Sequence, residues 1–231
     1  MTPERYRRIR AVLDRRQPDL TVLLDNVHKP HNLSAVLRTC DAVGVFEIHA
    51  VSTFEALEAH NDTSAGAGKW VELRVHRDLG HAAAGLKGRG FQIVAAHASS
   101  RAVDFRAIDY TRPTAVLLGA EKFGVSEAGA STADAHIAVP MVGMVESLNV
   151  SVAAAIILYE AQRQRAAAGL YGRPRLDAAT YAAALFRWGY PRLAAYCDAR
   201  ALAYPRLGAK GELLDPLPVE DDEAQLSTDH D

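Results

Sequence analysis

Apolar and polar positions alternate along residues 19–168 with two different periods. Short apolar runs predict strands at residues 20–24, 46–51, 71–75, 91–96, 115–118 and 136–139. Longer segments with helical spacing of apolar residues predict helices at residues 33–43, 79–87, 126–132 and 150–168. Strands that alternate with helices are typical of an α/β domain built on a mostly parallel sheet.

The first predicted helix has one apolar face, formed by Leu33, Val36, Leu37, Cys40 and Val43. Asn32 stands where a helix N-cap is expected, and Gly44 where a helix stop is expected. Arg38 lies off the apolar face, so its side chain is free to reach a cleft at the carboxyl ends of the strands. A purely structural interpretation also exists, in which Asn32 only caps the helix and Arg38 only pairs with Asp41 one turn later.

Residues 117–124, with the sequence LLGAEKFG, join a predicted strand to a loop that contains two glycines. Gly119 at the strand end allows the backbone to approach a ligand closely. The run does not match the GxGxxG fingerprint, and no acidic residue stands where it would bind a ribose. A nicotinamide cofactor is therefore poorly supported.

Residues 137–153, with the sequence IAVPMVGMVESLNVSVA, form the most specific stretch of the chain. A strand ends near Pro140, a loop with Gly143 follows, and Ser147 and Asn149 precede a long apolar helix. Capping explains Ser147 and Asn149 as single residues, but it does not explain polar residues throughout an otherwise apolar loop. The helix that follows is more apolar than a surface helix, which favours either a core position or a subunit interface.

Composition limits the fold to one sizeable domain with short extensions, because the 231 residues are 49% hydrophobic and 23% charged. We expect a basic helical arm at 1–18, the α/β domain at 19–168, a helical RNA-binding extension at 169–211 and an acidic tail at 212–231. Without a signal peptide or membrane span, the sequence predicts a soluble intracellular protein. Cys40 and Cys197 are expected to be reduced thiols, and the histidine spacing predicts no metal site.

Charge is distributed unevenly along the chain. The last 20 residues hold eight acidic residues and no Lys or Arg, so residues 1–211 carry a charge of +6 within a total of −2. Six arginines fall within residues 1–16, and a second cluster comprises Arg163, Arg165, Arg173 and Arg175. Such clusters suit a phosphate backbone, although a charge run can also be the solvated face of a helix. The polar, glycine-rich loop at residues 54–68 has no assigned role.

Three stretches together, residues 32–38, 117–124 and 140–153, resemble the motifs of the SPOUT superfamily of methyltransferases. Further runs resemble its tRNA guanosine-2′-O-methyltransferase group, which is TrmH-like; they are RRQPDLTV at 15–22, DNVHKPHN at 25–32, AVDFRAIDYTRPT at 102–114 and LYEAQRQR at 158–165. This resemblance implies a C-terminal deep trefoil knot, a homodimer and a cytoplasmic location. It also implies 2′-O-methylation of a guanosine in the tRNA D-loop, at guanosine 18, with S-adenosylmethionine as methyl donor and S-adenosylhomocysteine as product.

The resemblance also implies roles for individual residues. Catalysis would involve Arg38, Asn32, Glu121, Ser147 and Asn149. The cofactor would be held largely by backbone groups at Ala96, Gly119, Val139, Met144 and Leu148. The tRNA would be bound by Arg5, Arg8, Arg16, His31, Arg163, Arg165 and Arg173.

Arg38 is a poor general base because arginine keeps its proton in proteins. We therefore expect Arg38 to bind a phosphate and orient the ribose hydroxyl, with the phosphate or a water molecule accepting the proton. Two other functions stay open at this point. One is a ribosomal RNA 2′-O-methyltransferase of the same superfamily, and the other is a catalytically silent RNA-binding protein.

Overall fold

The computed structural model describes residues 1–51 and 67–216, and the chain divides into two compact units. We call Gln17–Gly172 the sheet unit, and Met1–Arg16 together with Arg173–Asp231 the helical unit. The predicted loop at residues 54–68 lies almost entirely outside the described residues, as does the acidic tail beyond residue 216. Among the described helices, none combines the length and hydropathy that a bilayer span requires.

A seven-stranded sheet forms the centre of the sheet unit, and every strand pair in it is parallel. The strands are β1 (Leu20–Asp25), β2 (Glu47–Val51), β3 (Glu72–His76), β4 (Gln92–Ala96), β5 (Val103–Asp104), β6 (Thr114–Gly119) and β7 (Ala135–Ala138). Their order across the sheet is β3-β2-β1-β6-β4-β7-β5. The predicted α/β fold with a mostly parallel sheet is confirmed, and all six predicted strands are present to within one or two residues.

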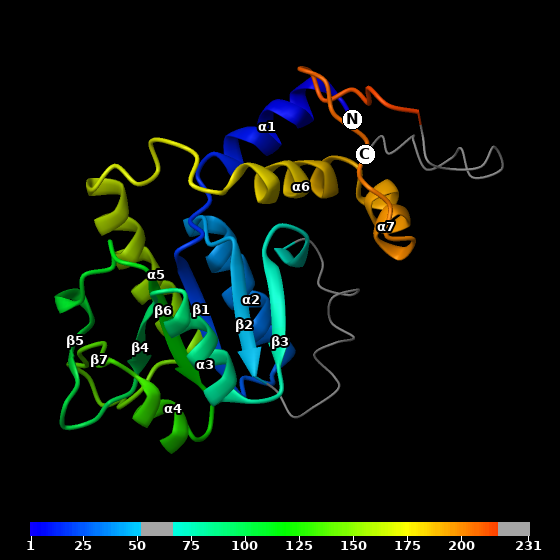
Figure 1. Ribbon diagram of the computed structural model, residues 1–231. Coiled ribbons are helices and arrows are strands. Elements are labelled where there is room, and N and C mark those ends of the chain that lie inside the picture. Colours follow the sequence, from blue (N-terminus) through cyan, green and yellow to red (C-terminus); the bar gives the residue numbers. More distant parts are fainter. Residues whose placement is uncertain (52–66, 217–231) are drawn as a thin grey trace. The chain divides into compact units, whose positions relative to one another are not determined.

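Helices cover both faces of this sheet (Figure 1). On one face lie α2 (Pro30–Val43) and α5 (Val150–Ala167), and on the other lie α3 (Leu79–Gly88) and α4 (Glu127–Thr132). Alternate residues of each strand supply the two cores. In β1, for example, Val22 and Leu24 pack towards α2 and α5, whereas Leu23 packs towards α3.

The start of α2 differs from the sequence expectation. The helix begins at Pro30, and Lys29 is the N-cap, without a side-chain hydrogen bond. Proline fits the first position of a helix because it has no backbone N–H to leave unpaired. Asn32 therefore lies in the first turn and is buried, so the prediction that it caps the helix is wrong. The helix ends as predicted at Gly44, in the left-handed conformation with φ of 84°.

The helical unit contains α1 (Pro3–Leu13), α6 (Ala178–Gly189) and α7 (Pro191–Ala199). Its small core is formed by Phe186, Tyr190, Leu193, Ala194 and Cys197. The described residues of this unit include thirteen Lys or Arg and six Asp or Glu, whereas those of the sheet unit include thirteen of each. Among the described residues the excess of positive charge therefore belongs to the helical unit, whereas the six acidic residues of 217–231 bring its whole sequence to thirteen basic and twelve acidic residues. Both cysteines are buried free thiols, as predicted.

Arg165, expected to bind RNA, is instead a buried structural residue of the sheet unit. Its side chain is fully buried, and its guanidinium donates to the Asp19 carboxylate at 2.7 Å and to the Gln17 side-chain oxygen at 2.9 Å. It also donates to three backbone carbonyl oxygens, those of Tyr110, Asp19 and Arg112. The prediction that Arg165 grips RNA is therefore wrong, because these bonds occupy the guanidinium inside the protein.

Replacing Arg165 with Ala is expected to lower the free energy of unfolding by about 3–5 kcal/mol, because the Asp19 carboxylate would lose its buried partner. Arg163→Ala serves as the matched control, since Arg163 lies on the same helix but forms an exposed pair with Glu160. In Arg163→Ala the free energy of unfolding is expected to fall by less than about 1 kcal/mol. Urea denaturation followed by circular dichroism measures both values, and equal losses would contradict the structural role.

Candidate functional site

A cavity of about 600 Å³ opens at the carboxyl ends of β4, β6 and β7. Its walls come from five parts of the sheet unit: Lys29 before α2, residues 96–98 after β4, residues within 118–125 after β6, residues 137–139 after β7, and the loop and first turns of α5. Ligands of parallel α/β sheets bind at this edge, where the connecting loops diverge. The size is typical of sites for small organic ligands.

The wall after β6 depends on a close approach between two backbone segments. A Cβ atom at Gly119 would lie 1.9 Å from the Gly124 carbonyl carbon and 2.0 Å from the Val125 nitrogen. The Gly124 N–H donates to the Ala120 carbonyl oxygen at 2.8 Å, and Gly124 has a positive φ of 67°. Only glycine fits at Gly119, so the residue singled out in the sequence is required by backbone packing.

Three side chains that are distant in sequence form one hydrogen-bonded network beside the cavity. Asn32 donates from its amide nitrogen to Glu121 Oε1 at 2.6 Å. Asn149 donates to the Asn32 side-chain oxygen at 3.1 Å. As the N-cap of α5, Asn149 also accepts from the Ser151 backbone N–H at 2.8 Å. The network thus joins α2, the loop after β6 and the start of α5.

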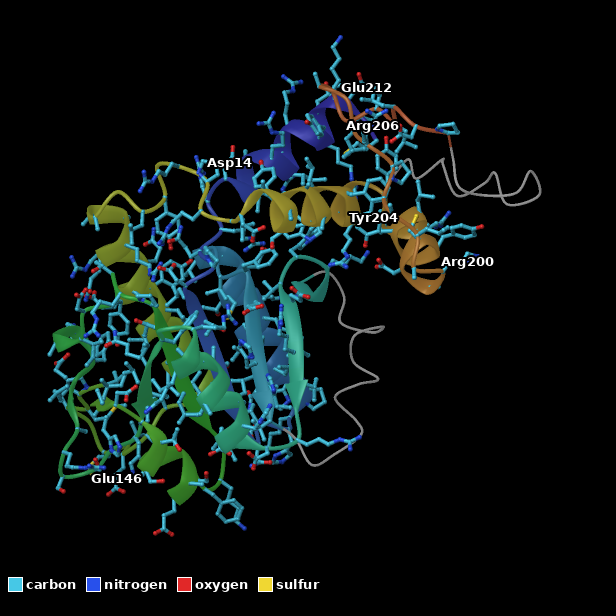
Figure 2. All side chains as sticks on the ribbon, viewed as in Figure 1. Asp14, Glu146, Arg200, Tyr204, Arg206 and Glu212 are labelled. Atoms are coloured by element: carbon cyan, nitrogen blue, oxygen red, sulfur yellow. The ribbon has the colours of Figure 1, made fainter. Side chains whose placement is uncertain are left out.

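Glu121 is a partly buried carboxyl group with several donors around it. Burial opposes its ionisation, but the hydrogen bond from Asn32, the backbone N–H groups of Glu121 and Lys29, and the nearby His28 outweigh that effect, so the pKa of Glu121 is lowered. Its Oε2 atom is buried and has no hydrogen-bond partner among the described residues, and His28 Nδ1 lies 3.7 Å away. Glu146 also lines the cavity and lies in the loop before α5 (Figure 2). Lys29 and Lys122 line the same cavity, so its wall carries two acidic and two basic side chains.

The structure brings most of the predicted catalytic and cofactor-binding residues to this cavity. Those that line it are Ala96, Gly119, Glu121, Val139, Ser147, Leu148 and Asn149. Asn32 contributes through its bonds to Glu121 and Asn149. Met144 does not line the cavity, because its side chain is 99% exposed.

Arg38 is also absent from the cavity wall in a single chain. It is exposed on α2 and forms no hydrogen bond or ion pair with another described residue, so the alternative pairing with Asp41 does not occur. Arg38 lies six positions after Asn32 on α2, and this spacing places the two side chains about 120° apart around the helix axis. Arg38 therefore faces solvent, while Asn32 faces the network.

The residues predicted to bind RNA fall into different environments. Arg16 is fully buried, and its guanidinium lies 5.2 Å from the centre of the Trp188 ring, so the prediction that Arg16 binds the tRNA is wrong. Arg5 is partly buried and donates to the Trp188 carbonyl oxygen at 3.2 Å. Arg163 is exposed but paired with Glu160. Among the residues predicted to bind RNA, those that are exposed and form no hydrogen bond or ion pair with another described residue are Arg8, His31 and Arg173.

Several lining residues were not singled out from the sequence, among them Lys29, His97, Lys122 and Glu146. A positional signal exists for His97, because it directly follows the predicted strand at residues 91–96. Lys29 directly precedes the proline that begins α2. Neither residue type indicates a ligand by itself, so only the spatial arrangement identifies them.

Comparison with known proteins gives matches along most of the chain. The model of the SpoU rRNA Methylase family matches residues 19–159, and that of the SpoU, rRNA methylase, C-terminal family matches residues 163–216. A tRNA (guanosine(18)-2′-O)-methyltransferase of Thermus thermophilus is 63% identical over 187 residues, which are 81% of this chain and 96% of the relative.

Two solved structures are also similar. The TrmH/SpoU tRNA modifying enzyme of A. aeolicus is 45% identical with a TM-score of 0.75, over 81% of this chain and 96% of that one. An AdoMet-bound rRNA methyltransferase of Sinorhizobium meliloti is 30% identical with a TM-score of 0.56, over 64% of this chain and 61% of that one.

The close approach at Gly119 leads to a stability prediction. Gly119→Ala is expected to lower the free energy of unfolding by at least about 1–3 kcal/mol, because the added methyl group overlaps backbone atoms that cannot rotate away. Gly85→Ala in α3 is the matched control, since a Cβ there meets nothing within 4 Å, and it should leave stability unchanged or slightly raised. Thermal denaturation of both variants measures the difference. A Gly119→Ala protein as stable as the wild type would contradict the packing argument.

Proposed function

Because the chain belongs to the SpoU rRNA methylase family, we propose that it methylates the ribose 2′-hydroxyl of guanosine 18 in the D-loop of tRNA. The observation that carries this proposal is the 63% identity to a relative with that activity in its name, over 96% of the relative. The rRNA methyltransferase of Sinorhizobium meliloti is only 30% identical to this chain, and the match covers 61% of that protein's structure. A silent RNA-binding protein would not need the cavity beside Asn32, Glu121 and Asn149.

S-adenosylmethionine is the cofactor that we propose for the cavity, where it would supply an electrophilic methyl group. The residues present fit such a group. Ala96, Gly119, Val139 and Leu148 line the walls, and Glu121 Oε2 is a buried acceptor without a hydrogen-bond partner among the described residues. Asn32 and Asn149 would hold Glu121 and the start of α5 in fixed positions, so that the site is ordered before the ligand binds.

The chemistry left to the protein is to position the ribose hydroxyl and to remove one proton. We propose that Arg38 binds the phosphate next to the target ribose, since its exposed guanidinium is accessible to RNA from the solvent side. The proton then passes to that phosphate or to a water molecule, because arginine does not act readily as a base. Ser147, exposed at the cavity, would contact the ribose or the cofactor.

A trefoil knot is proposed for the sheet unit, and the strand order supports it. β7 lies between β4 and β5, although the chain passes through β4, β5 and β6 before it reaches β7. Residues 97–113 therefore arch around the place that β7 occupies. The α5 helix then contacts the same arch, because Gln164 donates to the Ile108 carbonyl oxygen and accepts from the Tyr110 N–H. Tracing residues 96–150 in an experimental density map tests the threading.

A homodimer is the assembly that we propose, with α5 contributing to the interface. Val152 and Tyr159 on this helix are 45% and 54% exposed, which is unusual for apolar side chains of a helix that otherwise packs in the core. A tRNA substrate also implies a cytoplasmic location. We further propose that the exposed arginines of the helical unit, Arg8 and Arg173, and His31 bind the phosphate backbone of the tRNA.

The substrate is tested by incubating the protein with methyl-labelled S-adenosylmethionine and separated tRNA and ribosomal RNA, and then mapping the labelled nucleotide. We expect label at the 2′-oxygen of guanosine 18 in tRNA. Label confined to ribosomal RNA would favour the alternative substrate, and no label in either RNA would contradict the enzymatic function.

Arg38→Ala is expected to abolish methyl transfer while binding of S-adenosylhomocysteine stays within about twofold of the wild type, because Arg38 lies outside the cavity wall. Single-turnover assays and calorimetry measure the two properties. Arg77→Ala, at another exposed arginine of the sheet unit, is the control and should keep normal turnover. Near-normal turnover of the Arg38→Ala protein would remove Arg38 from the mechanism.

Affinity for tRNA should fall steeply with salt, because binding of phosphates releases counterions. Arg8→Ala and Arg173→Ala, at two exposed arginines of the helical unit, are each expected to reduce the slope of log K against log salt by about 1. Filter binding between about 50 and 200 mM salt measures the slope. A slope near zero for the wild type would show that the basic residues do not bind the RNA backbone.

A further inference from the structure

His136 on β7 is a buried imidazole that bonds to two other segments of the sheet unit. His136 is only 6% exposed. Nε2 lies 2.9 Å from the Ala130 carbonyl oxygen on α4, and Nδ1 lies 2.9 Å from the Ser99 hydroxyl in the loop after β4. A guanidinium nitrogen of Arg101 lies further away, 3.3 Å from Nε2.

The protonation pattern of this ring follows from its two closer partners. A carbonyl oxygen only accepts hydrogen bonds, so Nε2 carries the hydrogen and donates to Ala130. Nδ1 bonds to the Ser99 hydroxyl, which can both donate and accept a hydrogen bond. Each ring nitrogen therefore has one close partner, Nε2 on α4 and Nδ1 in the loop after β4.

These partners belong to the elements that form three walls of the cavity. Ser99 directly follows the lining residues 96–98, α4 follows the lining residues 118–125, and β7 itself ends in lining residues. His97, which lines the cavity, also packs against His136 edge to face, with ring centres 5.3 Å apart. His136 thus contacts residues in and next to the cavity wall but does not line the cavity itself.

We propose that His136 is a positioning residue that, through Ser99 and His97, fixes the cavity wall after β4 and so sets the affinity for S-adenosylmethionine. This role rests on the proposed function, since it assumes that the cavity holds this cofactor. When the wall is already ordered, ligand binding does not have to include the entropic cost of ordering residues 97–99. Loss of the Ser99 bond should therefore weaken binding of the cofactor and leave the bound reactants aligned as before.

The test compares Ser99→Ala, His136→Phe and the double variant in the full chain, with S-adenosylhomocysteine as the calorimetric probe. One neutral buried hydrogen bond corresponds to about a fivefold change in Kd. We expect each single variant to raise Kd about fivefold or more, and the double variant to differ little from His136→Phe, because both changes remove the same bond. KM for S-adenosylmethionine should rise in parallel, while kcat at saturation stays within about twofold. His136→Asn, which keeps a polar group near the Nδ1 position, should restore part of the affinity.

His49→Phe is the matched control for a general loss of stability. His49 is also buried, with 4% exposure, and is hydrogen-bonded to His76, but it lies on β2, four strands away from β7 in the sheet. His49→Phe should lower the melting temperature and leave Kd unchanged. Unchanged Kd in both Ser99→Ala and His136→Phe, or an equal rise in His49→Phe, would overturn the role of His136. A wild-type protein that binds no S-adenosylhomocysteine would overturn the proposed function as well.

Discussion

The side-chain amide of Asn32 joins three segments that are distant in sequence. It donates to Glu121 and accepts from Asn149, so α2, the loop after β6 and the start of α5 are held at one point. Because Asn32 is buried, with 2% exposure, loss of either partner would leave a polar group unsatisfied inside the protein. Burial raises the pKa of Glu121, but the bond from Asn32, together with backbone N–H groups and His28, lowers it by more. The geometry of the cavity depends on this network.

In the proposed function the cofactor binds in the sheet unit alone, whereas RNA contacts both the helical unit and two residues of the sheet unit, His31 and Arg38. The cavity, its network and its glycine-dependent wall all lie in the sheet unit, whose described residues carry no net charge. The described residues of the helical unit carry the excess of arginine and lysine. The cavity wall has acidic and basic side chains in equal number, Glu121 and Glu146 against Lys29 and Lys122, whereas exposed arginines of the helical unit suit a polyanion. In the proposed function, Arg38 binds RNA from the solvent-facing side of α2, outside the cavity wall of the same chain.

Much of the sheet unit could be predicted from the sequence, because its strands are short apolar runs and its helices have regular apolar faces. Gly119 and Asn149 were identified by position alone, at a strand end and at a helix start. The burial of Arg16 and Arg165 could not be predicted, since it depends on Trp188 and Asp19, which reach them only in the folded chain. Asparagine is a residue type that often caps helices, but α2 begins two residues earlier at Pro30, so Asn32 lies inside the helix and joins the network. His136 gave no signal, because an isolated histidine in an apolar strand is typical of a core residue.

The central claim is that the walls after β4, β6 and β7 and the Asn32 network together enclose S-adenosylmethionine. A crystal structure of the protein with S-adenosylhomocysteine tests it most directly. We predict ligand density between residues 96–98, 118–125 and 137–149, with the bonds from Asn32 to Glu121 and from Asn149 to Asn32 preserved. Ligand bound elsewhere, or a broken network around a bound ligand, would contradict it.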